Sequence, residues 1–466
     1  MMHYTNLMRL LLLMLPALLS AQTYEIVLQN GRVMDPESGL DAVRSVGITG
    51  NKIAAVSARP LRGKIEVDAT SLVIAPGFID LHQHSQTNVD YGFKAMDGVT
   101  TALELEVGVF PVSEWYAARQ GKSIINFGAS SGHIPARMMV MHDSGGLLPR
   151  DAAMNRAATP EEQKAVASAV EKGLDEGGLG MGMGIVYTPT ASPDEILNLF
   201  YLAAKFKRPV FVHMRATGNV ISALQEVITD SAASGAPLHV VHINSSSTAK
   251  TPDSLRMIEG ARARGLDVTT EAYPYTAGMT EIASARYAGL ENQPDSYFAS
   301  MLWPPTGERL TRESFLRYRR QGGFVAQFNN TEEMVRMAIA NPIVMIASDG
   351  ISEHPRSAGT YARVLGKYVR QEKALTLMDA IRKSSLLPAK WLEAFSAPMR
   401  QKGRVKVGAD ADLAVFDPDT VIDKSTFEKP AQYSEGFRYV LVGGTFVVRD
   451  GKLQTGVLPG QGIQAR

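Results

Sequence analysis

Two histidines stand at alternate positions in residues 77–84, Gly-Phe-Ile-Asp-Leu-His-Gln-His, directly after a short apolar run. Because successive side chains of a β-strand point to opposite faces, the imidazoles of His82 and His84 share one face. Imidazole nitrogens are common ligands of Zn²⁺ in proteins. A single His-x-His pair is a weak signal, so the positions of the other histidines decide whether it indicates a metal site.

Two more of the nine histidines also end apolar runs, His213 after residues 210–212 and His242 after residues 240–241. Asp349 follows a further apolar run, residues 343–347. Zinc accepts imidazole nitrogen and carboxylate oxygen together and leaves a coordination position for water. We therefore expect one or two Zn²⁺ ions, with other divalent metals as alternatives.

The elements that position these residues form a repeating pattern. Over residues 77–399, short apolar runs alternate with amphipathic helical stretches such as 159–176, 194–206 and 223–234. This pattern predicts an α/β fold, a TIM-like (β/α)8 barrel, whose strand ends carry the site. Residues 22–76 and 400–466 instead contain short strands with tight turns, and we expect both ends to pair into one small β-sandwich.

Composition narrows the choice of partner. The 466 residues carry a net charge of +1 with acids and bases interspersed, which argues against nucleic acid and favours a small-molecule substrate. The absence of cysteine excludes thiolate metal ligands and cysteine nucleophiles. The oligomeric state is not predicted.

The first 21 residues resemble a secretory signal peptide. His3 and Arg9 precede the apolar run 10–19, and the small residues Ser20 and Ala21 follow it. The run is too short to span a bilayer. We expect residues 1–21 to be removed on export and the mature protein to be periplasmic or secreted, with no membrane association.

The histidine pattern together with Ser348-Asp349-Gly350 resembles the amidohydrolase superfamily, and the flanking segments 30–35 and 403–413 extend the resemblance over nearly the whole chain. Within that superfamily the sequence is similar to the N-acyl-D-amino-acid deacylases. The similar stretches are 98–101, 132–133 with Arg137, 178–182 with Tyr187, 273–277, and 354–356 with 363–366. The resemblance implies a metal-dependent hydrolase that acts on linear amides.

Two departures from that family bear on the site. Where it has a cysteine as metal ligand, this chain has the acidic stretch 104–106, so the resemblance implies Glu106 as the ligand, with Glu104 as the alternative. Where it has a lysine near the substrate, this chain has Asn244, which cannot supply a positive charge. Arg356 then becomes the leading residue for a bidentate grip on an anionic substrate.

Tyr187 and Tyr273 are expected to line the same substrate pocket, where Asn244 also lies. His133 and His142 are not expected to be ligands, although His133 belongs to a family-like stretch that shapes the surroundings of the site. His239 is expected to be a packed core residue.

We expect Asp349 to be both a metal ligand and the catalytic group. In this hypothesis it takes a proton from the metal-activated water and delivers it to the leaving nitrogen. The ligand set is then His82, His84, Glu106, His213, His242 and Asp349.

Other readings of the sequence remain open. A dipeptidase, or a cyclic-amide hydrolase such as a dihydropyrimidinase or an imidazolonepropionase, would share the scaffold, since fold and ligands do not fix the substrate. A binding protein without catalysis is disfavoured because the four histidines and Asp349 are all present. The acyl group, the amino-acid side chain and the stereochemistry are not predicted, and the D-preference rests on resemblance.

Overall fold

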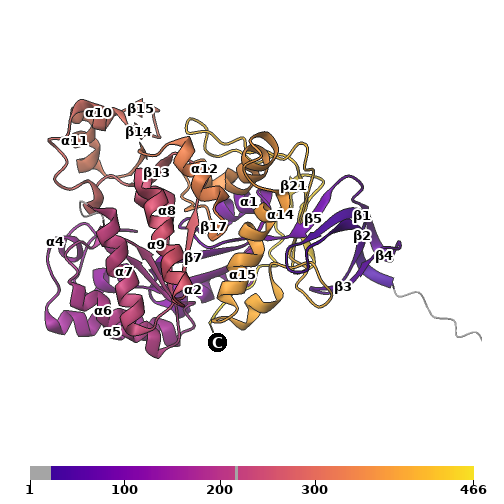
Figure 1. Cartoon of the computed structure of the whole chain (residues 1–466), viewed down its shortest axis with the longest axis horizontal. Coiled ribbons are helices and arrows are strands. Elements are labelled where there is room, and N and C mark those ends of the chain that lie inside the picture. Colours follow the sequence, from indigo (N-terminus) through magenta and orange to yellow (C-terminus); the bar gives the residue numbers. More distant parts are fainter. Residues whose placement is uncertain (1–22, 216–218, 466) are drawn as a thin grey trace, which may run out of the picture.

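The central element is a barrel of parallel strands, seen in a computed structural model that describes residues 23–215 and 219–465 (Figure 1). In the described chain eight strands follow one another in neighbouring order. They are β6 (Phe78–Asp80), β7 (Val99–Val109), β8 (Asn126–Gly132), β9 (Met181–Gly184), β10 (Val210–His213), β11 (Leu238–Val240), β12 (Val268–Ala272) and β17 (Val344–Ile346). The predicted signal peptide, residues 1–21, lies outside the described residues.

The barrel closes between its last and first strands just beyond their carboxyl ends. The backbone N–H of Gly350 donates to the carbonyl of His82 at 3.1 Å, and the N–H of His84 donates to the carbonyl of Gly350 at 2.9 Å. Beneath this bridge, the Ser348 hydroxyl donates to Asp80 at 2.6 Å, and Lys94 forms a buried ion pair with Asp80 at 2.8 Å. The closure thus holds Asp349, which follows β17, next to His82 and His84.

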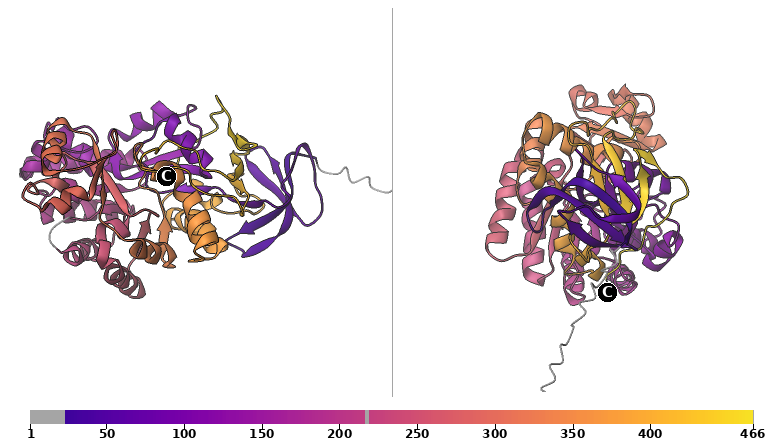
Figure 2. Two further views of the ribbon diagram at one scale, coloured as in Figure 1. Left: turned by 90° about the horizontal axis from the view of Figure 1, so that it is seen from above. Right: turned by 90° about the vertical axis from the view of Figure 1, so that its right-hand side faces the viewer.

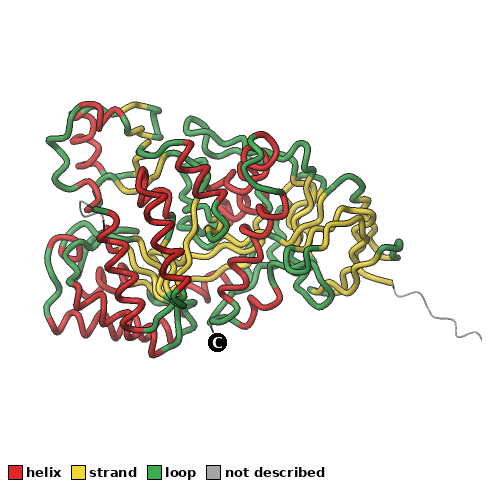
Figure 3. Tube along the Cα trace, viewed as in Figure 1, coloured by secondary structure: helices red, strands yellow, loops and turns green. Residues whose placement is uncertain are grey.

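Helices follow the strands and cover the outside of the barrel, as Figure 3 shows. The longer ones before β17 are α1 (Asn88–Met96), α2 (Val112–Arg119), α3 (His133–Val140), α5 (Pro160–Asp175), α6 (Pro193–Lys205), α7 (Val220–Ser234), α9 (Thr251–Ala263) and α12 (Glu332–Ala340). Short helices α4 (Ala152–Asn155) and α8 (Ile243–Ser247) lie between them, and α13 (Arg356–Arg363), η4 (Val364–Gln371), α14 (Leu377–Ile381), η5 (Arg382–Leu386) and α15 (Leu387–Leu392) follow β17. This arrangement confirms the predicted barrel.

Helix α5 illustrates how local sequence fixes these elements. Thr159 caps its first turn and forms a reciprocal capping box with Glu162, while Pro160 occupies the position where no N–H is needed. Val166, Val170 and their neighbours at helical spacing form the buried stripe that packs on the barrel. The observed helix agrees with the predicted stretch 159–176.

Strands from both ends of the chain form one further sheet, which lies beside the barrel at the right of Figure 1 and is also seen in Figure 2. The first five are β1 (Thr23–Asp35), β2 (Leu40–Thr49), β3 (Lys52–Ser57), β4 (Arg62–Asp68) and β5 (Val73–Pro76), and the last four are β18 (Leu413–Phe416), β19 (Phe437–Val442), β20 (Thr445–Arg449) and β21 (Lys452–Leu453). Antiparallel pairing of β18 with β5 joins the two ends, for example Val415 opposite Ile74. Both side chains belong to the sheet's own hydrophobic core.

An insertion between β12 and β17 was not anticipated from the sequence. Residues 277–328 form a small antiparallel sheet with two helices at the opposite end of the molecule from the terminal sheet (Figure 1). Its elements are β13 (Ala277–Glu281), α10 (Asp295–Ala299), β14 (Met301–Trp303), β15 (Glu308–Arg309), α11 (Arg312–Gln321) and β16 (Phe324–Phe328). A separate core that includes Phe298, Phe315 and Val325 stabilises it.

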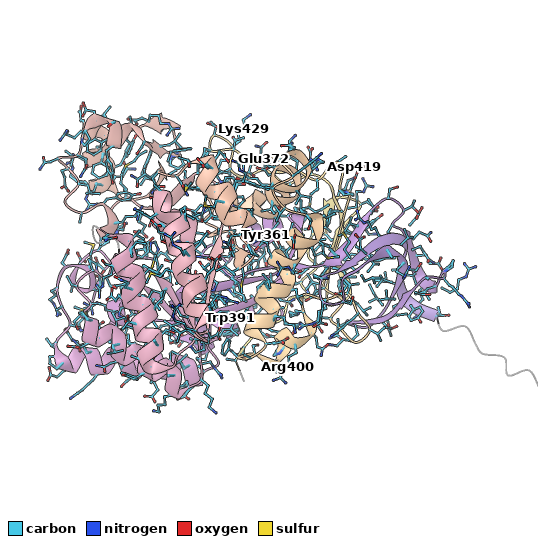
Figure 4. The ribbon with its side chains drawn as sticks, viewed as in Figure 1. Tyr361, Glu372, Trp391, Arg400, Asp419 and Lys429 are labelled. Carbon is cyan, nitrogen blue, oxygen red and sulfur yellow. The ribbon has the colours of Figure 1, made fainter. Side chains whose placement is uncertain are left out.

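Aromatic side chains connect the barrel to the helices after β17. Tyr361, labelled in Figure 4, stacks on Phe78 with ring centroids 5.2 Å apart. Trp391, also labelled there, packs on Phe211 and His239. None of the helices in the described part of the chain is long and apolar enough to cross a membrane.

Candidate metal centre

Four predicted ligand atoms converge at the carboxyl end of the barrel. Nε2 of His82 lies 3.1 Å from Nε2 of His84 and 2.5 Å from Oε2 of Glu106. Oδ1 of Asp349 lies 3.5 Å from the first imidazole nitrogen and 3.3 Å from the second. Glu106 lies in β7, the two histidines follow β6, and Asp349 follows β17, so the closure of the barrel brings them together.

The other nitrogen of each imidazole is held by a carboxylate. Nδ1 of His82 lies 2.6 Å from Oε1 of Glu271, and Nδ1 of His84 lies 2.9 Å from Oε2 of Glu104. A carboxylate on one nitrogen fixes the ring orientation and directs the lone pair of the other nitrogen at a metal. Glu104 therefore lies behind His84, and Glu106 is the glutamate of this strand that enters the cluster.

A second group shares Glu106. Its Oε1 lies 2.8 Å from Nδ1 of His213, and its Oε2 lies 3.7 Å from Nε2 of His242. The two imidazole rings contact edge to face with centroids 4.4 Å apart. The donor atoms thus form two overlapping sets, His82, His84, Glu106 and Asp349 in one, and Glu106, His213 and His242 in the other.

The spacing of the first set fits a tetrahedral ion. Metal–ligand bonds of about 2.0–2.1 Å place neighbouring ligands of a tetrahedral zinc about 3.3 Å apart. Four separations fall between 3.1 and 3.5 Å: Nε2 of His82 to Nε2 of His84, each of these nitrogens to Oδ1 of Asp349, and Nε2 of His84 to Oε2 of Glu106. The contact of His82 with Glu106 is closer. A mixed nitrogen and oxygen donor set of this size fits a divalent ion such as zinc.

Electrostatics at the cluster favour a bound cation. Burial lowers the pKa of His82, but Asp349, Glu271 and Glu106 outweigh it and raise that pKa to about 10. Burial raises the pKa of Glu106, yet His213 and His82 hold it well below its usual value. Burial and the neighbouring His242 lower the pKa of His213 to about 4, so this imidazole is neutral at physiological pH, as a metal ligand must be.

Asp349 is held in an unusual backbone conformation. Its φ is 51°, and that of His242 is 30°, both in the left-handed region that side-chain-bearing residues seldom adopt. Strained backbone of this kind gathers at functional sites. Nη1 of Arg356 lies 2.9 Å from Oδ2 of Asp349. Although burial raises the pKa of Asp349, Arg356 and His82 lower it well below the usual value, so the carboxylate is ionised.

A glycine allows β9 to approach β7, the strand that carries Glu106. A Cβ at residue 182 would lie 2.5 Å from the backbone oxygen of Glu106. Only glycine fits this contact between β9 and β7 without displacing backbone. Gly182 therefore helps to set the depth of Glu106 in the barrel.

A cavity of about 30 Å³ opens beside the cluster. His213, His242 and Asp349 line it, and the insertion contributes several further lining residues. The insertion residues are Gly278, Met279, Thr280, Arg286, Tyr287 and Gln327. The unanticipated insertion thus forms part of the site.

Arg286 is the cation of this cavity. Among the described residues, Arg286 forms no ion pair with a carboxylate. Burial lowers the pKa of its guanidinium, but Tyr287, Tyr187 and other neighbouring tyrosines outweigh burial and raise that pKa. Tyrosine hydroxyls do not neutralise a guanidinium, so this half-buried charge lacks its usual counterpart. An anionic ligand would supply one.

The four side chains predicted to bind substrate have different positions. Tyr187 lines the cavity, and Thr280 donates a hydrogen bond to its hydroxyl at 3.1 Å. Asn244 is fully buried and donates to the backbone oxygen of Tyr273 at 3.0 Å. Tyr273 is buried beneath Arg356, whose guanidinium lies 4.7 Å from the ring centroid.

Three further histidines lie outside the two donor sets. His133 is buried with Nε2 2.9 Å from Glu195, which also pairs with Arg137, and His142 is exposed. His239 is buried, and its Nε2 lies 3.1 Å from Oε2 of Glu271. His239 therefore has a polar role in addition to packing.

Two residues of the site were missed in the sequence. Glu271 lies within the buried strand β12. A carboxylate inside a buried strand was the feature of the sequence that could have indicated its role at the site. Arg286 lies in an insertion whose pairing depends on distant residues, and no local pattern marks it.

Comparison with known proteins agrees with this geometry. The sequence model of the amidohydrolase family matches residues 66–448. The N-acyl-D-glutamate deacylase of Alcaligenes xylosoxydans xylosoxydans is 28% identical over 91% of this chain and 93% of its own length. The D-aminoacylase of the same organism is also 28% identical, over 91% of this chain and 94% of its own length.

A solved structure shows the same architecture. The N-acyl-D-glutamate deacylase of Bordetella bronchiseptica, complexed with zinc and a phosphonate that mimics the tetrahedral intermediate, superposes with a TM-score of 0.81 and 25% identity. The match covers 95% of this chain and all of that one. Since the family model spans most of the sequence, the chain belongs to the amidohydrolase family.

Proposed function

We propose that this protein hydrolyses the amide bond of N-acyl amino acids, with a preference for the D-configuration. The observation that carries the proposal is Arg286, which among the described residues forms no ion pair with a carboxylate, in the cavity that Asp349 and two histidines also line. A substrate carboxylate would neutralise this guanidinium and bring the amide next to the cluster. The D-preference is supported by the similarity to an N-acyl-D-glutamate deacylase and a D-aminoacylase.

The proposed ligands are the two overlapping donor sets. His82, His84, Glu106 and Asp349 would hold one zinc ion, and His213 and His242 would hold a second through the shared Glu106. A bound divalent ion supplies Lewis acidity toward the amide carbonyl and activates a water molecule. Glu271 and Glu104 orient the first two imidazoles for this task.

Asp349 is proposed to move the proton. Its carboxylate is ionised, so it is ready to accept a proton from the attacking water. It then delivers that proton to the leaving nitrogen, because an amide nitrogen departs poorly as an anion. Arg356, 2.9 Å away, holds the carboxylate in place.

The choice between the two arginines follows from their partners. Arg356 remains a prediction for binding the anionic end of the substrate, but its guanidinium already faces Asp349. Arg286 faces no carboxylate within the described residues and can donate to one from the substrate, and Tyr187 lines the same cavity. A neutral cyclic amide would leave Arg286 without a counter-charge, so this observation favours N-acyl amino acids over the cyclic-amide alternative.

Metal content and amine release test the proposal together. Purified protein is assayed for zinc and then for amine release from paired N-acetyl-D- and N-acetyl-L-amino acids, with and without chelator. We expect stoichiometric zinc and release from the D-series that chelator abolishes and zinc restores. A His84→Ala variant, carried as a control, should bind less zinc than wild type and lose amine release. Metal-loaded protein that is inert on both series but opens cyclic amides would contradict the proposal.

We also propose that the protein acts outside the cytoplasm, as the signal-like segment 1–21 suggests. N-terminal sequencing of protein from the periplasm or the medium of an expressing bacterium tests this. A mature protein that begins near residue 22 is expected. Full-length protein confined to the cytoplasm would contradict it.

A further inference from the structure

A second cavity meets the first at Asp349. It measures about 20 Å³, and His84 and Asp349 are among the residues that line it. Its remaining wall is largely apolar and consists of Val107, Leu147, Leu148, Met279, Phe324 and Ile351. Tyr187, Met279, Thr280 and Asp349 line both cavities, so the two cavities adjoin at Asp349.

The two cavities differ in charge. The first contains the guanidinium of Arg286, whereas no arginine or lysine lines the second within the described residues. An N-acyl amino acid has the same asymmetry about its amide bond, an anionic amino-acid part on the nitrogen and an uncharged acyl group on the carbon. The anionic amino-acid part therefore fits beside the positive charge of Arg286, and the uncharged acyl group fits the apolar cavity.

We propose that this second cavity is the acyl-binding site and that it restricts the substrate to formyl or acetyl groups, with Leu147 and Phe324 as the residues that set the limit. This inference rests on the proposed function. At about 20 Å³ against about 30 Å³ for the cavity with Arg286, the apolar cavity is the smaller of the two, so it receives the smaller part of the substrate, an acyl group that ends in hydrogen or methyl.

The walls of the acyl site are fixed on both sides. Leu147 and Phe324 pack into one hydrophobic cluster with Met279 and Ile351. The loop that carries Leu147 is held by the carboxylate of Asp143, which accepts four backbone N–H groups at 2.8–3.0 Å. Close-packed walls of this kind do not yield to an extra methylene without cost.

An ion pair joins the two walls. Arg150, at the end of the same loop, lies 3.5 Å from Glu281 of the insertion. Glu281 stands directly opposite Phe324 in the pairing of β13 with β16. The insertion and the loop therefore close the acyl site together, which gives the insertion a role in substrate selection.

Acyl-chain length is the measurement that tests this site. Formyl, acetyl, butyryl and hexanoyl derivatives of one D-amino acid are compared by kcat/KM on zinc-loaded protein. Wild type is expected to lose about 10-fold or more in kcat/KM for butyryl and longer chains. Leu147→Ala and Phe324→Ala should raise the butyryl-to-acetyl ratio of kcat/KM about 10-fold or more. The milder Leu147→Val should shift the ratio in the same direction and covers the case in which an alanine variant folds poorly.

A matched control separates lost packing from a widened cavity. Leu316 packs in the core of the insertion and lines neither cavity, so Leu316→Ala should leave the ratio unchanged. The acyl-site inference is overturned if wild type hydrolyses long and short acyl groups equally, or if Leu147→Ala and Phe324→Ala leave the butyryl-to-acetyl ratio of kcat/KM unchanged. Both results leave the proposed function standing. Zinc-loaded wild type that hydrolyses none of the four derivatives overturns the proposed function and this inference with it.

Discussion

Oε1 of Glu271 lies 2.6 Å from Nδ1 of His82, at the back of the imidazole that enters the metal centre. The other oxygen of Glu271 lies 3.1 Å from Nε2 of His239, whose Nδ1 lies 2.8 Å from the hydroxyl of Thr269. A polar chain thus runs through the barrel from β11 and β12 to the cluster. Each member fixes the orientation of the next one.

We expect Glu271→Gln to weaken zinc binding about 10- to 100-fold, the usual effect of removing a carboxylate behind a ligand histidine. Competition with a chromogenic zinc chelator measures this without recourse to activity. Glu281→Gln removes a different buried carboxylate, which contacts Arg150, and should leave zinc affinity unchanged. Equal affinities in wild type and Glu271→Gln would show that Glu271 does not support the metal centre.

Asp349→Asn tests the proton-transfer role. The amide keeps the shape of the carboxylate but cannot accept a proton from water, so kcat should fall about 10²- to 10⁴-fold. The three remaining donors, His82, His84 and Glu106, should retain zinc. Zinc stoichiometry and turnover are measured on the same preparation. Turnover near that of wild type in the zinc-loaded variant would remove Asp349 from the mechanism.

Arg286→Met tests the assignment of the carboxylate partner. Loss of a charge-assisted hydrogen bond should lower kcat/KM for an N-acetyl-D-amino acid about 10- to 100-fold. The matching carboxamide, which carries no negative charge, should be hydrolysed by wild type and variant at similar rates. Arg317→Met, at an exposed position on α11, serves as the control. An unchanged preference of the variant for the carboxylate over the carboxamide would shift the role to Arg356.

The convergence of the donor side chains could be predicted from the sequence because parallel strands bring their carboxyl ends to one edge of the barrel. His82, His84, His213, His242 and Asp349 each follow a short apolar run, so the barrel prediction alone placed them together. The same reasoning does not reveal which carboxylate faces inward. Glu104 and Glu106 share a face of β7, and the pairing of Glu104 with His84 emerges only in three dimensions.

The parts that sequence reading missed depend on long-range contacts. The insertion was absorbed into the predicted barrel because its strands are short and pair with partners distant in the chain, such as Ala277 with Phe328. Arg286 could not be recognised without it. His239 was expected to be a packed core residue, and it is buried against Trp391, but its bond to Glu271 depends on the register of β11 with β12.

Lys383 provides a prediction about stability that is independent of the metal centre. It is buried in η5 and donates a hydrogen bond to the backbone oxygen of Asn341. Burial, with the nearby Arg382, lowers the pKa of its ammonium from 10.5 to about 7. Between about pH 7 and pH 10 the unfolded chain therefore binds more protons at this site than the folded chain, so the contribution of Lys383 to stability rises with pH.

Replacement by an uncharged side chain of similar length should remove this pH dependence. From pH 7 to pH 9, the free energy of unfolding of wild type should rise relative to Lys383→Met, by up to about 1.4 kcal/mol per pH unit. Urea unfolding of zinc-saturated protein at several pH values measures the difference. Lys164→Met, at an exposed position on α5, should follow wild type throughout. A difference in the free energy of unfolding between wild type and Lys383→Met that stays constant across this range would show that the lysine remains protonated in the folded protein. Only a lowered pKa of Lys383 makes the folded and unfolded chains differ in bound protons near neutral pH.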